Sequence, residues 1–219
     1  MIISRGRNYI FVHAPKTGGT SMALALEARA MKDDLMLGDT PKALKRRRRL
    51  KDAEARGRLW KHSTLADIDG LVSAEEVAQM FIFTLVRNPW DRLVSYYHWL
   101  QSQRFDHPAV ALAQQLEFRA FAQAPHVVAS LKASPARHYV TDAAGTERCN
   151  AFLRIEHLAE DIAPLEAHLG FALEVPRANK SDRDADWRCY YDTASADSVA
   201  AACAEDIVRF GYRFDGASG

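Results

Sequence analysis

The chain has 219 residues, of which 48% are hydrophobic, 26% are charged and 10% are aromatic. This is the composition of a globular protein with one sizeable core, and it excludes a disordered, collagen-like or disulfide-scaffold chain. The 29 basic residues nearly balance the 28 acidic ones, so the net charge is +1 at pH 7. A uniformly basic nucleic-acid binder is thereby excluded, although a local basic patch is not.

The three cysteines, Cys149, Cys189 and Cys203, are too few for a disulfide framework and form no C-x-x-C pair. We expect reduced thiols that are buried or half-buried. The N-terminus has no apolar signal-peptide region, and no stretch approaches the roughly 20 apolar residues of a membrane span. The sequence therefore predicts a soluble, cytoplasmic protein without a membrane span.

Apolar runs alternate with helix-favouring segments along the chain. The runs at residues 8–13, 80–86 and 149–155 are typical of strands, and the second is continuous, as in strands of parallel sheets that are buried on both faces. Helices are expected over residues 21–31, from about residue 91, and over 156–169 with Gly170 at the end. Strands that alternate with helices predict an α/β fold.

A last helix is predicted near the C-terminus. One helical face carries Val199, Cys203, Ile207 and Phe210, and Gly211 follows at the position of a C-terminal cap. We expect this helix to pack over an edge of the sheet.

The segment PKTGGTS, residues 15–21, joins the first strand directly to the first helix. The first N–H groups of a helix lack partners within the helix and attract anions. Gly18 and Gly19 allow the backbone to curl around an oxyanion, Thr17, Thr20 and Ser21 add hydroxyls, and Lys16 adds a positive charge. Because Lys16 precedes both glycines, the segment is not a Walker A loop. A plain turn capped by Thr20 or Ser21 is the alternative.

A second candidate anion site follows the second strand. Arg87 lies at the carboxyl end of that strand, where ligands of open α/β sheets bind, and Ser95 lies one to two turns into the next helix. Arg87 offers a bidentate fork to a phosphate and Ser95 offers a hydroxyl. The alternative is that Arg87 only pairs with Asp91 and that Ser95 has no role.

Together, PKTGGTS and VRNPWDRLVSYY, residues 86–97, resemble the two signature motifs of sulfotransferases that use 3′-phosphoadenosine 5′-phosphosulfate (PAPS). The resemblance implies that residues 16–21 hold the 5′-phosphosulfate and that Arg87 with Ser95 holds the 3′-phosphate. It implies a P-loop-like parallel sheet flanked by helices in three layers, in a single sulfotransferase domain over residues 1–219. Adenosine 3′,5′-bisphosphate would be the product.

The variant with Lys-Thr-Gly-Gly-Thr and Arg-Asn-Pro-Trp-Asp-Arg is most similar to the carbohydrate branch, which includes heparan and chondroitin sulfotransferases and bacterial relatives. The similarity continues at residues 154–158, 179–181 and 210–214, so it spans nearly the whole chain. It implies that Lys180 contacts the donor and that the acceptor is a small molecule or a glycan. Residues 32–78 and 105–136 vary in the family and would determine the acceptor.

Sulfuryl transfer develops negative charge on the leaving phosphate oxygen, and Lys16 is placed to meet that charge. An acceptor hydroxyl also needs a general base, which is most often a histidine with a pKa near 6.5. His62 precedes Ser63-Thr64, a potential helix cap, and it matches the position of the base in the carbohydrate branch. His138 is the reserve candidate, whereas His13 and His98 are expected to pack. We expect no metal ion.

Residues 42–51, KALKRRRRLK, form a basic run after the helix-start signal Asp39-Thr40-Pro41. The positive electrostatic field of this run is expected to steer an acidic acceptor toward the protein. Nucleic acid is not expected, because aromatic residues do not interleave the charges. Two other functions stay open: a kinase-like nucleotide phosphotransferase, and a non-catalytic module that binds anions or nucleotides.

Overall fold

The structure is a computed structural model that describes residues 1–176, 178 and 183–215. The chain divides into two compact units. The first comprises Met1–Val86 and Ala136–Asn179, and the second comprises Arg87–Pro135 and Lys180–Gly219.

The first unit contains a five-stranded sheet with the order β3-β1-β2-β4-β5. Its strands are β1 (Ile2–Ser4), β2 (Tyr9–Val12), β3 (Leu35–Met36), β4 (Phe81–Val86) and β5 (Ala151–Arg154). The neighbours β2, β4 and β5 are parallel, which confirms the three predicted strands. β1 is antiparallel to β2 and to β3, so the sheet is mixed. A tight turn that ends at Asn8, which has a φ of 53°, reverses the chain between β1 and β2 and makes the two strands antiparallel.

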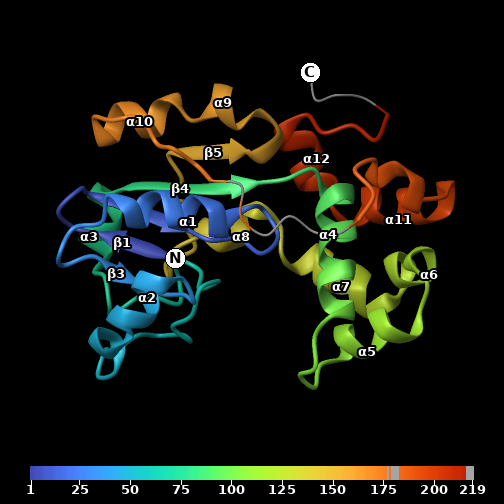
Figure 1. Ribbon diagram of the computed structural model, residues 1–219, viewed down its shortest axis with the longest axis horizontal. Helices are drawn as coiled ribbons and strands as arrows, with labels where there is room; N and C mark the ends of the chain where they lie inside the picture. Colours follow the sequence, from blue (N-terminus) through green and yellow to red (C-terminus); the bar gives the residue numbers. More distant parts are fainter. Residues whose placement is uncertain (177, 179–182, 216–219) are drawn as a thin grey trace. The chain divides into compact units, whose positions relative to one another are not determined.

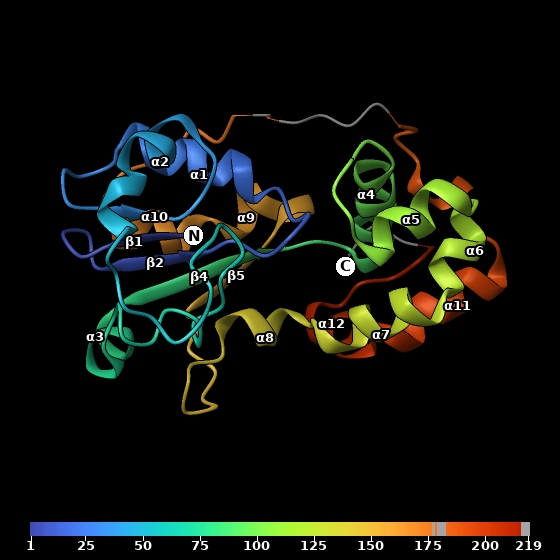
Figure 2. The same ribbon diagram turned by 90° about the horizontal axis from the view of Figure 1, so that it is seen from below.

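Helices cover both faces of this sheet, in agreement with the expected three layers (Figures 1 and 2). α1 (Gly19–Ala28) and α2 (Pro41–Arg46) lie on one side of the strands, and α3 (Ala74–Gln79) and α8 (Ala136–Val140) lie on the other. The remaining helical segments of this unit are η1 (Arg47–Leu50), η2 (Ile155–His157), α9 (Leu158–Asp161) and α10 (Ala163–Leu169).

Alternate side chains of β2 enter two hydrophobic cores, which explains its unbroken apolar run. Tyr9 and Phe11 pack with Met22 and Leu26 of α1. Ile10 and Val12 pack on the opposite side with residues that include Val77 of α3 and Val140 of α8. Because both faces of the strand are buried, hydrophobic residues occupy every position of it.

The helix predicted over residues 156–169 is interrupted. η2, α9 and α10 follow one another there, and α10 has Pro164 in its first turn. Proline has no N–H to donate to the preceding turn, so one continuous helix does not form. Gly170 ends α10 with a φ of 75°, as predicted.

In its described residues the second unit is helical. It contains α4 (Pro89–Gln101), α5 (Pro108–Gln115), α6 (Phe118–Gln123), α7 (Pro125–Ala133), η3 (Trp187–Tyr190), α11 (Thr193–Ala202) and α12 (Ala204–Phe210). Its aromatic rings form a cluster, in which Trp90 lies within 6.3 Å of Trp187 and 5.5 Å of Phe214 between ring centroids. Tyr191 donates a hydrogen bond of 2.9 Å to the carbonyl of Trp90.

The predicted C-terminal helix differs from the expectation. It is divided at Cys203, whose backbone lies outside the helical region (φ −110°, ψ 20°). In addition, α11 packs against α4, α6 and α7 of its own unit. These three helices of the second unit supply the apolar partners of α11. Gly211 ends α12 in the left-handed conformation, as predicted.

Cys149 and Cys203 are half-buried thiols, as expected, whereas Cys189 is exposed, so the expectation of burial was wrong for that residue. Across residues 1–176, 178 and 183–215, we find no helix with the length and apolar character needed to cross a membrane.

Candidate functional site

The PKTGGTS segment forms a tight loop between β2 and α1. α1 begins at Gly19, and Gly18 precedes it with a φ of 82°, with no side chain capping the helix. Lys16 also has a positive φ, 64°, which is rare for a residue with a side chain and marks local backbone strain. The buried Thr17 hydroxyl donates to the carbonyl of Ala14 at 2.9 Å and holds the curl in place. The first turn of α1 is therefore available to an anion.

Both glycines are required by close packing. A Cβ atom on Gly19 would lie 2.0 Å from Cδ2 of His13, and one on Gly18 would lie 2.3 Å from Cδ1 of Ile155. The backbone of the loop therefore rests directly on the His13 ring, and a larger residue at position 19 requires that ring to move.

The cap that the alternative interpretation assigned to Thr20 or Ser21 was wrong. Both residues lie inside the first turn of α1 rather than at its cap. The Ser21 hydroxyl instead accepts a hydrogen bond of 3.1 Å from the backbone N–H of Ala178. Ser21 thus connects the loop to the segment just before the predicted contact Lys180, which lies outside the described residues.

His62 lies beside this loop through its contacts with His13. Its Nδ1 is 2.8 Å from the carbonyl oxygen of His13. Because a carbonyl only accepts, Nδ1 carries the proton in the neutral ring, and Nε2 keeps its lone pair. The ring centroids of the two histidines are 4.7 Å apart in an edge-to-face arrangement. An imidazole held in this tautomer suits proton abstraction through Nε2.

Burial keeps both rings neutral. It lowers the pKa of His62 to about 4, and the positive charges of Lys61 and of the N-terminus act in the same direction. The hydrogen bond to the His13 carbonyl and the charge of Asp39 act against this shift. The pKa of His13 is lowered well below its usual value, chiefly by burial. His62 is therefore unprotonated at neutral pH, although as a weaker base than free histidine.

The segment around His62 is a turn and not a helix start. No helix follows Ser63 and Thr64, so the cap predicted there was wrong. Thr64 and Asp67 instead exchange hydrogen bonds: the Thr64 N–H donates to Oδ2 of Asp67 at 2.7 Å, and the Asp67 N–H donates to Oγ1 of Thr64 at 3.2 Å. The backbone is thus fixed locally, within the loop between η1 and α3 (Figure 1).

The amino group of Met1 supports the same segment. It is buried, which lowers its pKa to about 4, and it donates hydrogen bonds of 2.9 Å to the carbonyls of Leu37 and Lys61. The carbonyl of Lys61 immediately precedes His62 in the chain. Met1, the residue before β1, therefore helps to hold the segment that carries the candidate base.

The other histidine candidates have different surroundings. His138 is exposed on α8, with its ring 5.3 Å from that of Tyr139. His98, in the second unit, packs edge-on against Tyr190 at 5.1 Å, in agreement with its predicted packing role. Neither ring has a contact like that of His62 with the His13 carbonyl.

In the second unit, Arg87 is held by Asp91. The Arg87 Nη2 atom lies 2.7 Å from Oδ2 of Asp91, so the ion pair that the alternative interpretation named is present. The same carboxylate also contacts Arg183, which lies three residues beyond Lys180 and which the sequence analysis did not single out. Ser95 is buried on α4, one turn after Asp91. Asp91 thus fixes the orientation of two guanidinium groups.

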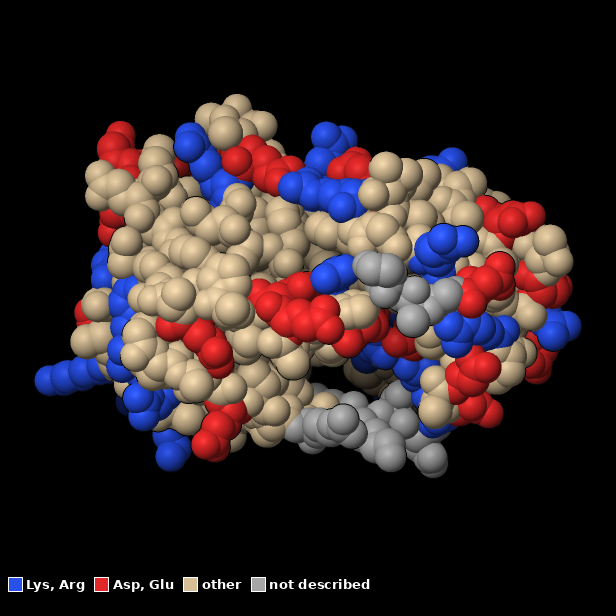
Figure 3. Space-filling view, turned by 90° about the horizontal axis from the view of Figure 1, so that it is seen from above, with Lys and Arg blue, Asp and Glu red and all other residues tan. Residues whose placement is uncertain are grey.

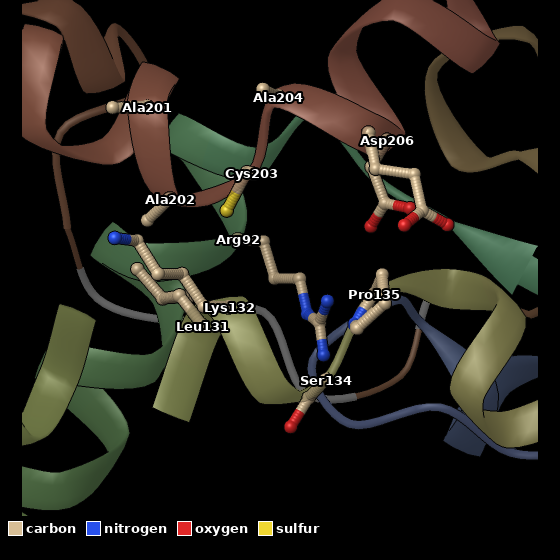
Figure 4. A pocket seen from close by; sticks show the side chains of 11 residues that line it. Arg92, Leu131, Lys132, Ser134, Pro135, Ala201, Ala202, Cys203, Ala204 and Asp206 are labelled. Carbon is tan, nitrogen blue, oxygen red and sulfur yellow. The ribbon is translucent and has the colours of Figure 1, made fainter. Parts of the chain in front are cut away.

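A cavity of about 170 Å³ in the second unit is unrelated to these residues. It lies between α7 and the junction of α11 with α12, and the Arg92 side chain extends across it (Figure 4). Ligand pockets usually measure about 300–1,000 Å³, so it is too small for a nucleotide.

Some side chains of the basic run make hydrogen bonds within the first unit. Three of its side chains donate to backbone carbonyls: Lys42 to Glu27, Arg46 to Met31, and Arg49 to Lys32. These three contacts hold part of the run against the loop after α1. On the face of the molecule shown in Figure 3, Lys and Arg are interspersed with Asp and Glu.

The sheet has α/β architecture, and its strand β2 leads through a glycine-containing loop into the uncapped N-terminus of α1. The family model for the sulfotransferase family matches residues 1–200, and the chain belongs to that family. Its members take the sulfuryl group from PAPS, as the motif resemblance implied, so the chain is an enzyme of that class.

Among solved structures, mouse sulfotransferase SULT7A1 complexed with PAP is similar to this chain. The sequences are 16% identical, the match covers 94% of this chain and 85% of the mouse chain, and the TM-score is 0.48. No curated protein matches the chain.

Proposed function

We propose that this protein transfers a sulfuryl group from PAPS to a hydroxyl of a carbohydrate acceptor, with His62 as the general base. The observation that carries the proposal is the contact between Nδ1 of His62 and the carbonyl of His13. His13 also supports the anion-binding loop at Gly19. One residue thus connects the candidate base to the candidate donor loop.

The loop fits a phosphosulfate. The first turn of α1 has no side-chain cap, the missing side chains of Gly18 and Gly19 let the loop curl tightly against Ile155 and His13, and Lys16 adds a cation. When bound, PAPS supplies the sulfuryl group and is left as adenosine 3′,5′-bisphosphate. Residues 16–21 bind and orient its 5′ end, and Lys16 stabilises the charge that grows on the leaving oxygen.

Arg87 and Ser95 are proposed to bind the 3′-phosphate. Asp91 holds the Arg87 guanidinium through Nε at 2.8 Å and Nη2 at 2.7 Å, which fixes the plane of the group proposed to meet the phosphate. Lys180 is proposed as a further donor contact. In this proposal residues 1–219 act as one sulfotransferase domain, which needs both units for activity.

His62 accepts the proton of the acceptor hydroxyl at Nε2. The low pKa of the ring keeps this atom unprotonated at neutral pH. The reaction as proposed needs no metal ion and no nucleic acid.

Calorimetry with adenosine 3′,5′-bisphosphate and with AMP tests the donor site. The bisphosphate is expected to bind more tightly than AMP by about ten- to a hundredfold, the value of one charge-assisted bidentate contact. Arg87→Ala is expected to remove most of that difference, whereas the exposed Arg119→Ala on α6 is expected to retain it. Equal affinities in the unaltered protein contradict the proposal. Transfer from radiolabelled PAPS to an acceptor panel then identifies the acceptor class.

A further inference from the structure

Arg58 and Trp60 lie next to His62 and have no part in the proposed donor site or in proton transfer. Trp60 is 41% exposed, although tryptophan is usually well buried. Its ring centroid is 5.0 Å from that of His62, with the two planes at 89°. The Arg58 guanidinium lies over the indole, with Cζ 5.1 Å from the ring centroid. A cation, an aromatic ring and the candidate base are therefore consecutive neighbours.

A buried side chain holds this arrangement in place. The hydroxyl of Ser63 is fully buried, and it donates to the carbonyl of Arg58 at 2.8 Å and accepts from the N–H of Trp60 at 2.9 Å. Between them, Leu59 packs against the hydrophobic core. Arg58 and Trp60 are thus presented outward on a fixed backbone, which reduces the entropy lost when a ligand binds them.

Arg58 differs from the cations around it in its partners. Lys61 pairs with Asp39 at 2.7 Å, and Arg56 donates to the carbonyl of Ala143 at 3.2 Å. In the described part of the chain, Arg58 contacts no carboxylate, and its recorded contact is the indole of Trp60. A guanidinium stacked on an aromatic ring keeps its hydrogen-bonding edge available to an anion.

We propose that Arg58 and Trp60 form an acceptor subsite that binds a carboxylate-bearing sugar ring beside His62. Trp60 supplies apolar surface for the ring, and Arg58 supplies a planar fork that matches a planar carboxylate. The subsite rests on the proposed function, because it takes its place in the reaction from His62. It selects acceptors by charge and orients the accepting hydroxyl, and the proton transfer remains with His62.

The test uses two probes that differ only in charge: hexagalacturonate and its methyl ester. Each is titrated by calorimetry into protein saturated with adenosine 3′,5′-bisphosphate. The acid is expected to bind at least tenfold more tightly than the ester, and Arg58→Gln is expected to abolish that preference. Trp60→Ala is expected to weaken the binding of both probes, and Trp60→Phe is expected to restore most of it.

Arg48→Gln is the matched control, because it removes an exposed arginine from the same unit without touching Trp60. If this control reduces the preference as much as Arg58→Gln does, the effect is general electrostatics and the subsite is wrong. Equal affinity for the two probes in the unaltered protein also overturns it.

A failure of the proposed function has a different signature. Binding of adenosine 3′,5′-bisphosphate is measured first on every variant. If the unaltered protein does not bind the bisphosphate, the proposed donor site is wrong. If it binds the bisphosphate but shows no preference for the acid over the ester, only the acceptor subsite is wrong.

Discussion

At the scale of single residues, His62 shows how burial changes the chemistry of a side chain. Free imidazole titrates near pH 6.5, but burial lowers the pKa of His62 to about 4. The ring is a weaker base than free imidazole, but it is unprotonated throughout the physiological pH range. Its tautomer is fixed by one hydrogen bond to the carbonyl of His13.

His62→Ala is expected to lower kcat/KM by about 10²–10⁴-fold while donor affinity is unchanged. In the unaltered enzyme, kcat/KM rises with pH as the base loses its proton, so the acidic limb is expected near pH 4 rather than near 6.5. The measurement is a pH profile with a hydroxyl acceptor. His138→Ala, which alters an exposed ring, serves as the control and is expected to retain both the rate and the limb. If His138→Ala loses the limb instead, the base is His138.

Lys16→Ala is expected to lower kcat more than it raises the Kd of the donor. Charge on the leaving oxygen develops only in the transition state, so an interaction with it affects the rate rather than ground-state binding. Single-turnover kinetics and calorimetry on the same variant separate the two effects. A loss confined to the Kd assigns Lys16 to donor binding alone.

At the scale of elements, the loop between β2 and α1 depends on a contact that lies outside it. Gly19 packs against the ring of His13, which in turn holds His62 through its carbonyl. The helix start, the strand end and the candidate base therefore form one packed group. Elements that appear separate in the sequence share this contact.

Gly19→Ala is expected to lower the melting temperature and to weaken donor binding, because the new Cβ collides with the His13 ring. The double variant His13→Ala/Gly19→Ala removes the obstacle and is expected to regain part of the lost stability. Thermal unfolding of the two single variants and the double variant measures this coupling. Additive losses would mean that the glycine is needed for a different reason.

At the scale of the whole molecule, buried groups that are neutral in the native state link stability to pH. Burial lowers the pKa of the Met1 amino group and of both His13 and His62. The unfolded chain binds protons at these groups at pH values where the native chain does not. Stability therefore rises with pH through this range.

We expect the urea midpoint to fall as the pH decreases from about 8 toward 4, the interval between the ordinary pKa of an amino group and the lowered values. Circular dichroism at a series of pH values measures the slope. His62→Gln removes one of these groups and is expected to flatten the slope between pH 6.5 and 4. An unchanged slope in this variant would show that His62 is protonated in the native state.

The sequence by itself determined the three parallel strands, the position of Gly170 at a helix end, and the family. These features depend on local signals: apolar runs, fixed backbone angles and two short motifs. The tight turn from β2 into α1 was also predictable, because glycine adopts the positive φ that Gly18 has there.

Only the tertiary structure decided the antiparallel β1, the contact of His62 with the His13 carbonyl, and the pairing of Asp91 with both Arg87 and Arg183. It also decided that α11 packs among helices and that Arg58 is presented next to His62 on the indole of Trp60. The reason is physical: partner choice and burial depend on residues far apart in the chain. The lowered pKa of His62 likewise comes from its surroundings, which a motif does not contain.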